Sequence, residues 1–402
     1  MIRFGKRMCL VGSIIFLLCM VSGCAKGEIT EMSDDSETGV TVASGVKEIS
    51  VTPLNLTQYS LGYQEGTDDV QFCSYQRVAG YTENGLYFWA NDQGMLLYFD
   101  YELGEYYPVC SKPDCAHVDD NCSAFFNSDR CDGVRYSRNY LQYYEGMLYI
   151  HGYDEDGVVS LYSITPDGSI FRKEMELYRV DISLDENGGF EYKNPEILIH
   201  RGYVYYINHM DEKECIRRAK LGASESEVVF YNSGQRANTY RMKGIGDYLF
   251  FQSGCFVDDE YVNINSGIWA YNIHTGEVQY VVDNAYAFYY IAGNELYYLQ
   301  EQKLYCVDLL MQQTDVIIDQ LPSGPLPFYI ENDYIYVDCI TEANVLFRYK
   351  REDLSLDTCS GTAIGSLSYL HDNLILGPSA TNSMKQYERI NEIMRLDELE
   401  WK

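Results

Sequence analysis

The chain has 402 residues, of which 60 are acidic and 30 basic, for a net charge of −30. Because apolar residues make up 46% of it, a chain that stays unfolded for want of a core is excluded. The acidic excess excludes a nucleic-acid-binding protein and a protein that binds membranes through a polybasic surface, since both need an excess of Lys and Arg.

Residues 1–23 have the pattern of an export signal. Arg3, Lys6 and Arg7 precede an uncharged apolar run at 8–21. At a rise of about 1.5 Å per residue, a helix of this run reaches about 21 Å, which is short of the ~30 Å core of a bilayer. A basic segment before a short apolar one is typical of a signal peptide, so we expect cleavage in preference to an uncleaved anchor helix.

The predicted cleavage site is Val21-Ser22-Gly23-Cys24. Small residues before the cut suit a signal peptidase, and the thiol of Cys24 offers a site for lipid attachment. This order resembles the lipobox of bacterial lipoproteins. The resemblance implies acyl chains such as palmitate on Cys24, and a protein anchored at the extracellular face of the bacterial cell membrane. A plain secretory signal followed by a chance cysteine is the alternative.

Residues 24–54 are predicted to be a lipidated, flexible tether. The segment is rich in Gly, Ser, Thr, Glu, Asp and Val and has no aromatic side chain. Such a composition cannot bury enough apolar surface to fold by itself. A flexible segment of this length spans roughly 30 Å in the r.m.s. sense, which holds the following domain clear of the membrane.

Residues 55–402 carry an internal repeat. Short aromatic and aliphatic runs alternate with Gly, Asn and Asp turns, which predicts many short β-strands. A unit of one turn and one strand recurs about every 48 residues. The strands of this unit begin at Leu86, Met147, Tyr203, Tyr248, Leu296, Tyr334 and Leu374. A second unit of strand, polar turn and strand follows, most clearly at 268–278.

Two hairpin-forming units per repeat predict a four-stranded antiparallel sheet. Seven such sheets around one centre predict an all-β fold, a seven-bladed β-propeller. Six or eight blades are alternatives, as are an unclosed sandwich and a pair of barrels. Each blade would bury both of its faces, which explains aromatic residues at successive positions. We expect a strand within 55–80 to complete the last blade and close the ring.

The signal, the lipobox and the blade pattern resemble uncharacterised lipoproteins of clostridial, Gram-positive bacteria. The blade strand Tyr205-Tyr206-Ile207-Asn208 and the hairpin at 271–277 carry the resemblance, which covers about residues 55–402 and the signal. Those lipoproteins have a propeller similar to the YWTD type of the low-density-lipoprotein receptor, although the literal Tyr-Trp-Thr-Asp motif is absent here. The resemblance implies a surface location and no established activity.

The most distinctive local feature is a cluster of Cys110, Cys115, His117 and Cys122, with Cys131 nearby. The predicted extracellular location permits oxidation, so we expect disulfides among the four cysteines, whose pairing the sequence leaves open. They would staple a loop that lacks apolar residues. Three thiolates and one imidazole also form a set that zinc prefers, which makes zinc the second hypothesis and the one cofactor the sequence suggests. Free thiols are the third.

The sequence assigns no catalytic residue and no binding residue. It contains no Gly-x-Ser-x-Gly elbow, no His-Glu-x-x-His and no phosphate-binding loop. The acidic runs at 154–157 and 258–260 lack EF-hand spacing, so we expect solvated turns there in preference to calcium sites. The aromatic residues at 286–290 are expected to pack in a strand in preference to stacking on sugars.

Long insertions at 111–140, 185–195 and 253–267 are candidate binding loops. We therefore predict a binding or interaction module for a protein, peptide or glycan at the cell surface. One alternative is a carbohydrate-active hydrolase or lyase with a site at the central channel. Another is a structural or assembly lipoprotein of an envelope complex.

Overall fold

The computed structural model describes residues 62, 68, 79–90, 94–117, 122–126, 134–136, 140–180, 196–210, 213–232, 238–256, 264–283, 288–321, 328–331, 333–339, 345–360, 369–371, 374–378 and 391–402. All of them lie in one compact unit, Gly39–Lys402. The predicted signal, Cys24 and the predicted tether fall outside the described residues. Among the residues that are described, no helix is long and apolar enough to cross a membrane.

The strands form seven antiparallel sheets that follow one another in chain order. The first sheet comprises β1 (Ala79–Thr82), β2 (Gly85–Trp89), β3 (Leu96–Asp100) and β4 (Glu105–Pro108). The second comprises β5 (Arg135–Tyr136), β6 (Gln142–Tyr144), β7 (Met147–Tyr153), β8 (Val158–Ile164) and β9 (Phe171–Arg179). The third comprises β10 (Ile197–His200), β11 (Tyr203–Met210), β12 (Lys213–Lys220) and β13 (Ser226–Tyr231). The fourth comprises β14 (Asn238–Ile245), β15 (Tyr248–Phe256), β16 (Ile264–Asn272) and β17 (Val278–Val282).

The remaining three sheets continue the same order. The fifth comprises β18 (Tyr289–Ala292), β19 (Glu295–Gln300), β20 (Lys303–Asp308) and β21 (Gln313–Ile318). The sixth comprises β22 (Phe328–Glu331), β23 (Tyr334–Cys339), β24 (Val345–Lys350) and β25 (Leu356–Ser360). The seventh comprises β26 (Tyr369–His371), β27 (Leu374–Pro378) and β28 (Asn391–Arg395), and the 3-10 turn η3 (Leu396–Glu398) follows it.

The predicted number of four-stranded blades is wrong. Six of the described sheets have at least four strands, whereas the sheet of β26, β27 and β28 has three. The structure therefore shows six blades, not seven. In the last repeat, β27 pairs with β26 on one side and with β28 on the other, and no fourth described strand pairs with β28. The strand that we expected within 55–80 to complete the last blade falls almost wholly outside the described residues, and β1, which begins at Ala79, pairs with β2 in the first blade.

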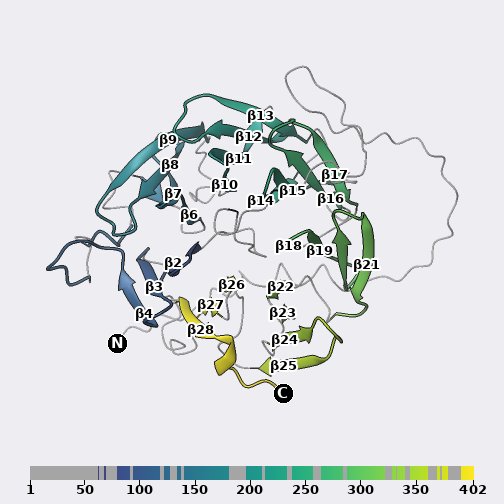
Figure 1. Cartoon of the computed structure of the whole chain (residues 1–402). Helices are drawn as coiled ribbons and strands as arrows, with labels where there is room; N and C mark the ends of the chain where they lie inside the picture. The colour runs from purple at the N-terminus through teal and green to yellow at the C-terminus, as the bar shows by residue number, and fades with distance from the viewer. Residues whose placement is uncertain are drawn as a thin grey trace, which may run out of the picture. The chain divides into compact units, whose positions relative to one another are not determined.

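The core lies between consecutive sheets, as in a propeller. Trp89 of β2 shares one apolar cluster with Leu148 and Ile150 of β7. Tyr149, on the opposite face of β7, packs in the next cluster with Tyr206 of β11. Successive side chains of one strand thus face different neighbouring blades, which confirms that aromatic runs at successive positions reflect two buried faces. Figure 1 shows the sheets around a common centre, with β10, β14, β18 and β22 nearest to it. This arrangement excludes the sandwich and the pair of barrels.

The two ends of the blades are connected differently. At one end, which we call the turn end, every first strand joins the second through two residues, counting β6 and β7 as the first and second strands of the second sheet. Third strands join fourth strands there through at most six residues. At the other end, the loop end, second strands join third strands and each blade joins the next. The longest connections of the chain lie there, at 109–134, 180–196 and 379–390.

Local hydrogen bonds close the turn ends. In the β16–β17 turn, Asn272 Oδ1 accepts from the backbone N–H groups of His274 and Thr275, each at 2.9 Å. Gly276 follows in the left-handed region with φ +73° and donates its N–H to the Asn272 carbonyl at 2.9 Å. Asp100 caps the β3–β4 turn in the same way. Its Oδ1 accepts hydrogen bonds from the backbone N–H groups of Glu102 and Leu103, each at 2.9 Å. The predicted polar hairpin turns are confirmed.

One predicted insertion is shorter than expected. Residues 253–267 were expected to form a loop, but β15 continues to Phe256 and β16 begins at Ile264. Ser253 pairs with Gly267 and Cys255 with Asn265, so the hairpin extends beyond its apolar part. The residues of this extension are mostly polar or small, so the sequence lacks the apolar pattern that predicts a strand. The strands still pair, because the ladder hydrogen bonds join backbones and do not depend on apolar side chains.

Candidate metal centre

The cysteine–histidine cluster lies at the loop end of the first blade, where it follows β4. Backbone hydrogen bonds fasten both parts of the loop to the β2–β3 connection. Val109 donates its N–H to the Leu96 carbonyl at 3.1 Å, and Leu96 donates to the Ala124 carbonyl at 2.8 Å. Met95 and Phe125 form an antiparallel bridge. These contacts bring Cys110 and Cys122 together although the chain between them is long.

Tight turns orient the cysteines. Cys115 donates its N–H to the Lys112 carbonyl at 3.3 Å, and Pro113 stands at the second position of that turn, where its fixed φ fits. A second turn runs from the Cys122 carbonyl to the Phe125 N–H at 3.2 Å. His117 has a φ of +55°, a left-handed conformation that is uncommon for residues other than glycine.

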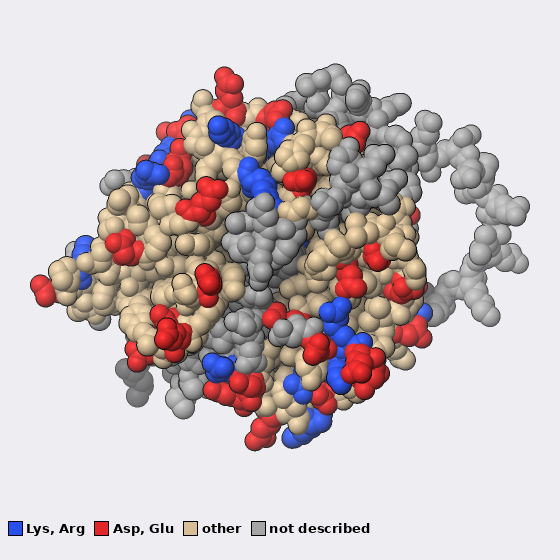
Figure 2. All heavy atoms as spheres, viewed as in Figure 1, with Lys and Arg blue, Asp and Glu red and all other residues tan. Residues whose placement is uncertain are grey.

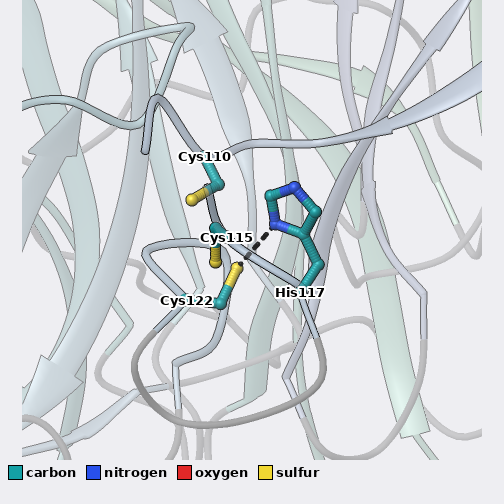
Figure 3. Close-up of side chains that lie close together, drawn as sticks. All are labelled: Cys110, Cys115, His117 and Cys122. Atoms are coloured by element: carbon teal, nitrogen blue, oxygen red, sulfur yellow. Dashed lines mark hydrogen bonds between the residues drawn. The ribbon is translucent and has the colours of Figure 1, made fainter. Parts of the chain in front are cut away.

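The four side chains converge on one point (Figure 3). The Sγ atoms of Cys110, Cys115 and Cys122 and a ring nitrogen of His117 all lie within 4.8 Å of one another. His117 Nδ1 is 3.2 Å from the Cys122 Sγ. Cys122 is fully buried, whereas the other three are half-buried. Among the described residues, this is the one group of three or more Cys, His, Asp or Glu side chains placed to hold a metal ion.

Backbone N–H groups point at the sulfur atoms. Ala124 donates its N–H to the Cys122 Sγ at 3.4 Å. At Cys110 two effects on the thiol pKa oppose each other. Burial raises this pKa, but hydrogen bonds from the Ser123 side chain and from the backbone of Lys112 and Ser123 outweigh burial, so the pKa of Cys110 is lowered. Burial raises the pKa of Cys122, and its neighbour Cys110 adds to that rise. One thiolate therefore forms more readily than the other.

The arrangement permits two kinds of chemistry. Three thiols and an imidazole this close together can bind a tetrahedral metal ion, and any two of the thiols can form a disulfide. The three described cysteines of the cluster are free thiols, and Cys131 lies outside the described residues. The expected disulfides therefore stay a prediction.

The remaining cysteines that the structure describes belong to blade strands. Cys215, Cys306 and Cys359 are buried free thiols. Burial raises the pKa of Cys215 to about 11 and that of Cys306 to about 11. They have the environment of inert core residues.

The other features singled out in the sequence serve the fold. Asp154 Oδ1 accepts from the N–H groups of Asp156 at 3.1 Å and Val158 at 2.9 Å, so this acidic run closes the β7–β8 turn. The acidic run at 258–260 lies outside the described residues. Tyr289 and Tyr290 are buried, as expected of a packed strand.

Sequence reasoning missed a set of buried polar groups. His151 is only 1% exposed, and among the described residues neither ring nitrogen has a hydrogen-bond partner. Burial lowers its pKa to about 3. Near the loop ends of the third and fourth blades, Asn232 donates to Ser253 Oγ at 2.8 Å and to the Gly254 carbonyl at 2.9 Å. No local motif signals these contacts, because the partners are far apart in the sequence.

No family model and no curated protein matches the chain. Among solved structures, a puromycin hydrolase complexed with PGG is similar with a TM-score of 0.52 and 13% identity, over 88% of this chain and 55% of that chain. A structure from a study of two prolyl endopeptidases is similar with a TM-score of 0.51 and 14% identity, over 86% of this chain and 51% of that chain. The present chain thus spans about half the length of either enzyme.

A nidogen–laminin complex gives a TM-score of 0.39 at 13% identity, over 68% of this chain and 92% of that chain. A score this low carries no argument about the type of propeller. At the identities of the two enzymes, the likeness shows the fold and no activity. What the comparisons support is that the chain is a β-propeller.

Proposed function

We propose that this protein is a lipid-anchored extracellular β-propeller whose loop end binds a protein, peptide or glycan at the cell surface. The anchor rests on the signal and on Cys24 in the order of a lipobox. The binding role rests on the fold. Neither role depends on the metal centre.

The unequal ends of the blades carry the proposal. Turn-end connections are short and are closed by their own side chains, which leaves them little room for variation. Loop-end connections are long, and in a propeller they gather around one end of the inner strands. Long connections held by a rigid scaffold are where binding surfaces are found. The predicted insertions at 111–140, 185–195 and 253–267 all fall at this end.

Surface charge bears on the class of ligand. On the face shown in Figure 2, acidic and basic side chains are interspersed. Among the described residues several charged side chains pair, as Arg172 does with Glu174 at 2.7 Å and Arg218 with Glu227 at 2.6 Å. Together with a net charge of −30, this pairing disfavours an anionic polymer as ligand. Recognition by hydrogen bonds and stacking, as for a neutral glycan or a peptide, fits better.

Metabolic labelling tests the anchor. Cells that produce the full chain are fed a palmitate analogue, and the protein is captured and probed for the label. We expect labelling of the wild type and none of Cys24→Ser. Equal labelling of both would contradict lipidation at Cys24.

Array binding tests the loop end. The chain is probed on glycan and peptide arrays beside two variants. In one, the β15–β16 connection at 257–263 is replaced by Asn-Gly, a two-residue turn that suits a hairpin. In the other, the exposed turn-end residues His274 and Glu277 become alanine. We expect the loop-end variant to lose at least about ten-fold in affinity, and the turn-end variant to stay within about two-fold.

Two results would overturn the proposal. One is an equal loss of binding in the two variants, which would detach binding from the loop end. The other is release of product from a polysaccharide without stable binding, which would favour the carbohydrate-active enzyme.

A further inference from the structure

We propose that Cys110, Cys115, His117 and Cys122 bind one zinc ion, which closes the loop between the first and second blades. With four protein ligands, a tetrahedral ion here would have no open coordination position for a substrate. Its role is therefore to hold structure, and it adds to the proposed function without depending on it.

The geometry fits tetrahedral zinc. Zinc bonds of about 2.0–2.3 Å to nitrogen and sulfur place the ligand atoms of a tetrahedron roughly 3.3–3.8 Å apart. The four ligand atoms here all lie within 4.8 Å of one another, and His117 Nδ1 is 3.2 Å from the Cys122 Sγ. Small side-chain movements bring all four within bonding distance of one ion.

The contacts favour a metal over a disulfide. A disulfide between two of the three described cysteines would use two of their sulfur atoms and would give neither the third of these thiols nor the His117 ring a part in that bond. The N–H groups of Lys112 and Ala124 each stand two residues after a cysteine and donate to the sulfur of that cysteine. Hydrogen bonds of this kind stabilise thiolate ligands and orient them around a metal.

The ion would hold together a segment with little core of its own. The apolar cluster beneath the site consists of Cys122, Ala124 and Phe125, with Met95, Cys110 and Cys115 at its edge. Clusters this small seldom fold without a metal or a covalent link.

The same segment joins two blades. Phe126 directly follows the cluster, with its ring 5.6 Å from that of Trp89 in β2 and 5.6 Å from that of Phe171 in β9. Zinc at the cluster would therefore fix the position of a side chain that packs against both the first and the second blade.

Elemental analysis and intact mass test the proposal. The full chain is purified in detergent without chelators or reductants, and its metals are quantified. Part of the sample is then denatured in acid, which releases zinc and leaves disulfides intact. We expect one zinc per chain and a denatured mass with the thiols of the cluster in reduced form. Two or four missing hydrogens without metal would overturn the proposal in favour of disulfides, and reduced thiols without metal would overturn it as well.

Substitutions of His117 separate the zinc site from a cysteine-only site. We expect His117→Ala to weaken zinc binding at least ten-fold, and His117→Cys to keep one zinc, because four thiolates also suit zinc. The matched control, Cys215→Ser, removes a buried thiol of a blade and should retain one zinc. Equal zinc affinity in wild type and His117→Ala would overturn the assignment of the four ligands.

Cobalt provides a readout that does not rely on a fully stable variant. Tetrahedral cobalt bound to thiolates has intense charge-transfer absorption, which we expect for the wild type and for Cys215→Ser. Absence of that absorption in the wild type would contradict thiolate coordination.

Discussion

The turn ends and the loop ends of the blades are built on different principles. At the turn ends, a side chain caps a backbone two or three residues further on, as Asn272 caps His274 and Thr275. At the loop ends, the hydrogen bonds join remote segments, as Asn232 joins Ser253 and Gly254. In these two examples a turn end is closed by neighbours in sequence and a loop end by neighbours in space. Both kinds of hydrogen bond occur at either end, since Asp154 closes the β7–β8 connection locally and the Gly246 carbonyl in the β14–β15 turn accepts from the remote His200 ring. Substitution of Asn232 should therefore cost more than substitution of Asn272, because the groups that Asn232 binds are buried out of reach of water.

Acid should weaken the loop ends most. His151 lies in the loop-end half of β7, and burial lowers its pKa to about 3, whereas an unfolded histidine titrates near 6.5. Between these values the unfolded chain binds more protons, so the free energy of unfolding falls as the pH falls. His151 contributes about 1.4 kcal/mol per pH unit in that window.

Denaturant unfolding between pH 7 and pH 4 measures this effect. Carboxylates also titrate in acid, so the comparison is between the wild type and His151→Leu. We expect the variant to have the shallower pH dependence. The control is His274→Ala, whose histidine is exposed at a turn end. If the free energy of unfolding of His151→Leu changed with pH as steeply as that of the wild type, His151 would not be buried in its neutral form.

Asn232→Ala should cost about 2–3 kcal/mol in the free energy of unfolding, because it removes the amide donor to the buried Gly254 carbonyl and to the Ser253 hydroxyl, which keeps Thr239 Oγ1 at 3.0 Å as a partner. Chemical denaturation at pH 7 measures this loss. A change below about 0.5 kcal/mol would mean that water reaches these groups, and the loop ends would then resemble the turn ends.

Asn272→Ala is the matched turn-end substitution and should cost only about 1 kcal/mol. The N–H groups that it uncaps belong to His274 and Thr275, which are exposed and can bond to water. The same denaturation experiment applies. A cost equal to that of Asn232→Ala would remove the difference between the two ends.

Leu354→Gly should stabilise the protein by about 0.5 kcal/mol. Leu354 takes the position in the β24–β25 turn that Gly276 takes in the β16–β17 turn, and its φ is +57°. Glycine relieves the strain of the left-handed backbone, which stabilises the fold by about 1–2 kcal/mol. Part of this gain is offset because glycine loses more conformational entropy on folding than leucine does. Thermal unfolding of Leu354→Gly and of the reciprocal variant Gly276→Ala measures the effect, and we expect the first to raise and the second to lower the free energy of unfolding. Destabilisation by Leu354→Gly would show that the half-exposed leucine contributes more by packing than it loses by strain.

The sequence by itself determined the all-β class, the repeat of about 48 residues and the polar hairpin turns. It also identified Cys110, Cys115, His117 and Cys122 as a group. These features depend on residues close together in the chain, whose turn hydrogen bonds and alternation leave a readable pattern.

Only the tertiary structure decided how many blades are complete, that β1 belongs to the first blade, and that His151 is buried. It also decided that the four ligand atoms meet at one point, because the bridge between Met95 and Phe125 returns the loop to the first blade. Such outcomes depend on pairings between remote segments. Their energy comes from contacts that the order of residues along the chain does not display.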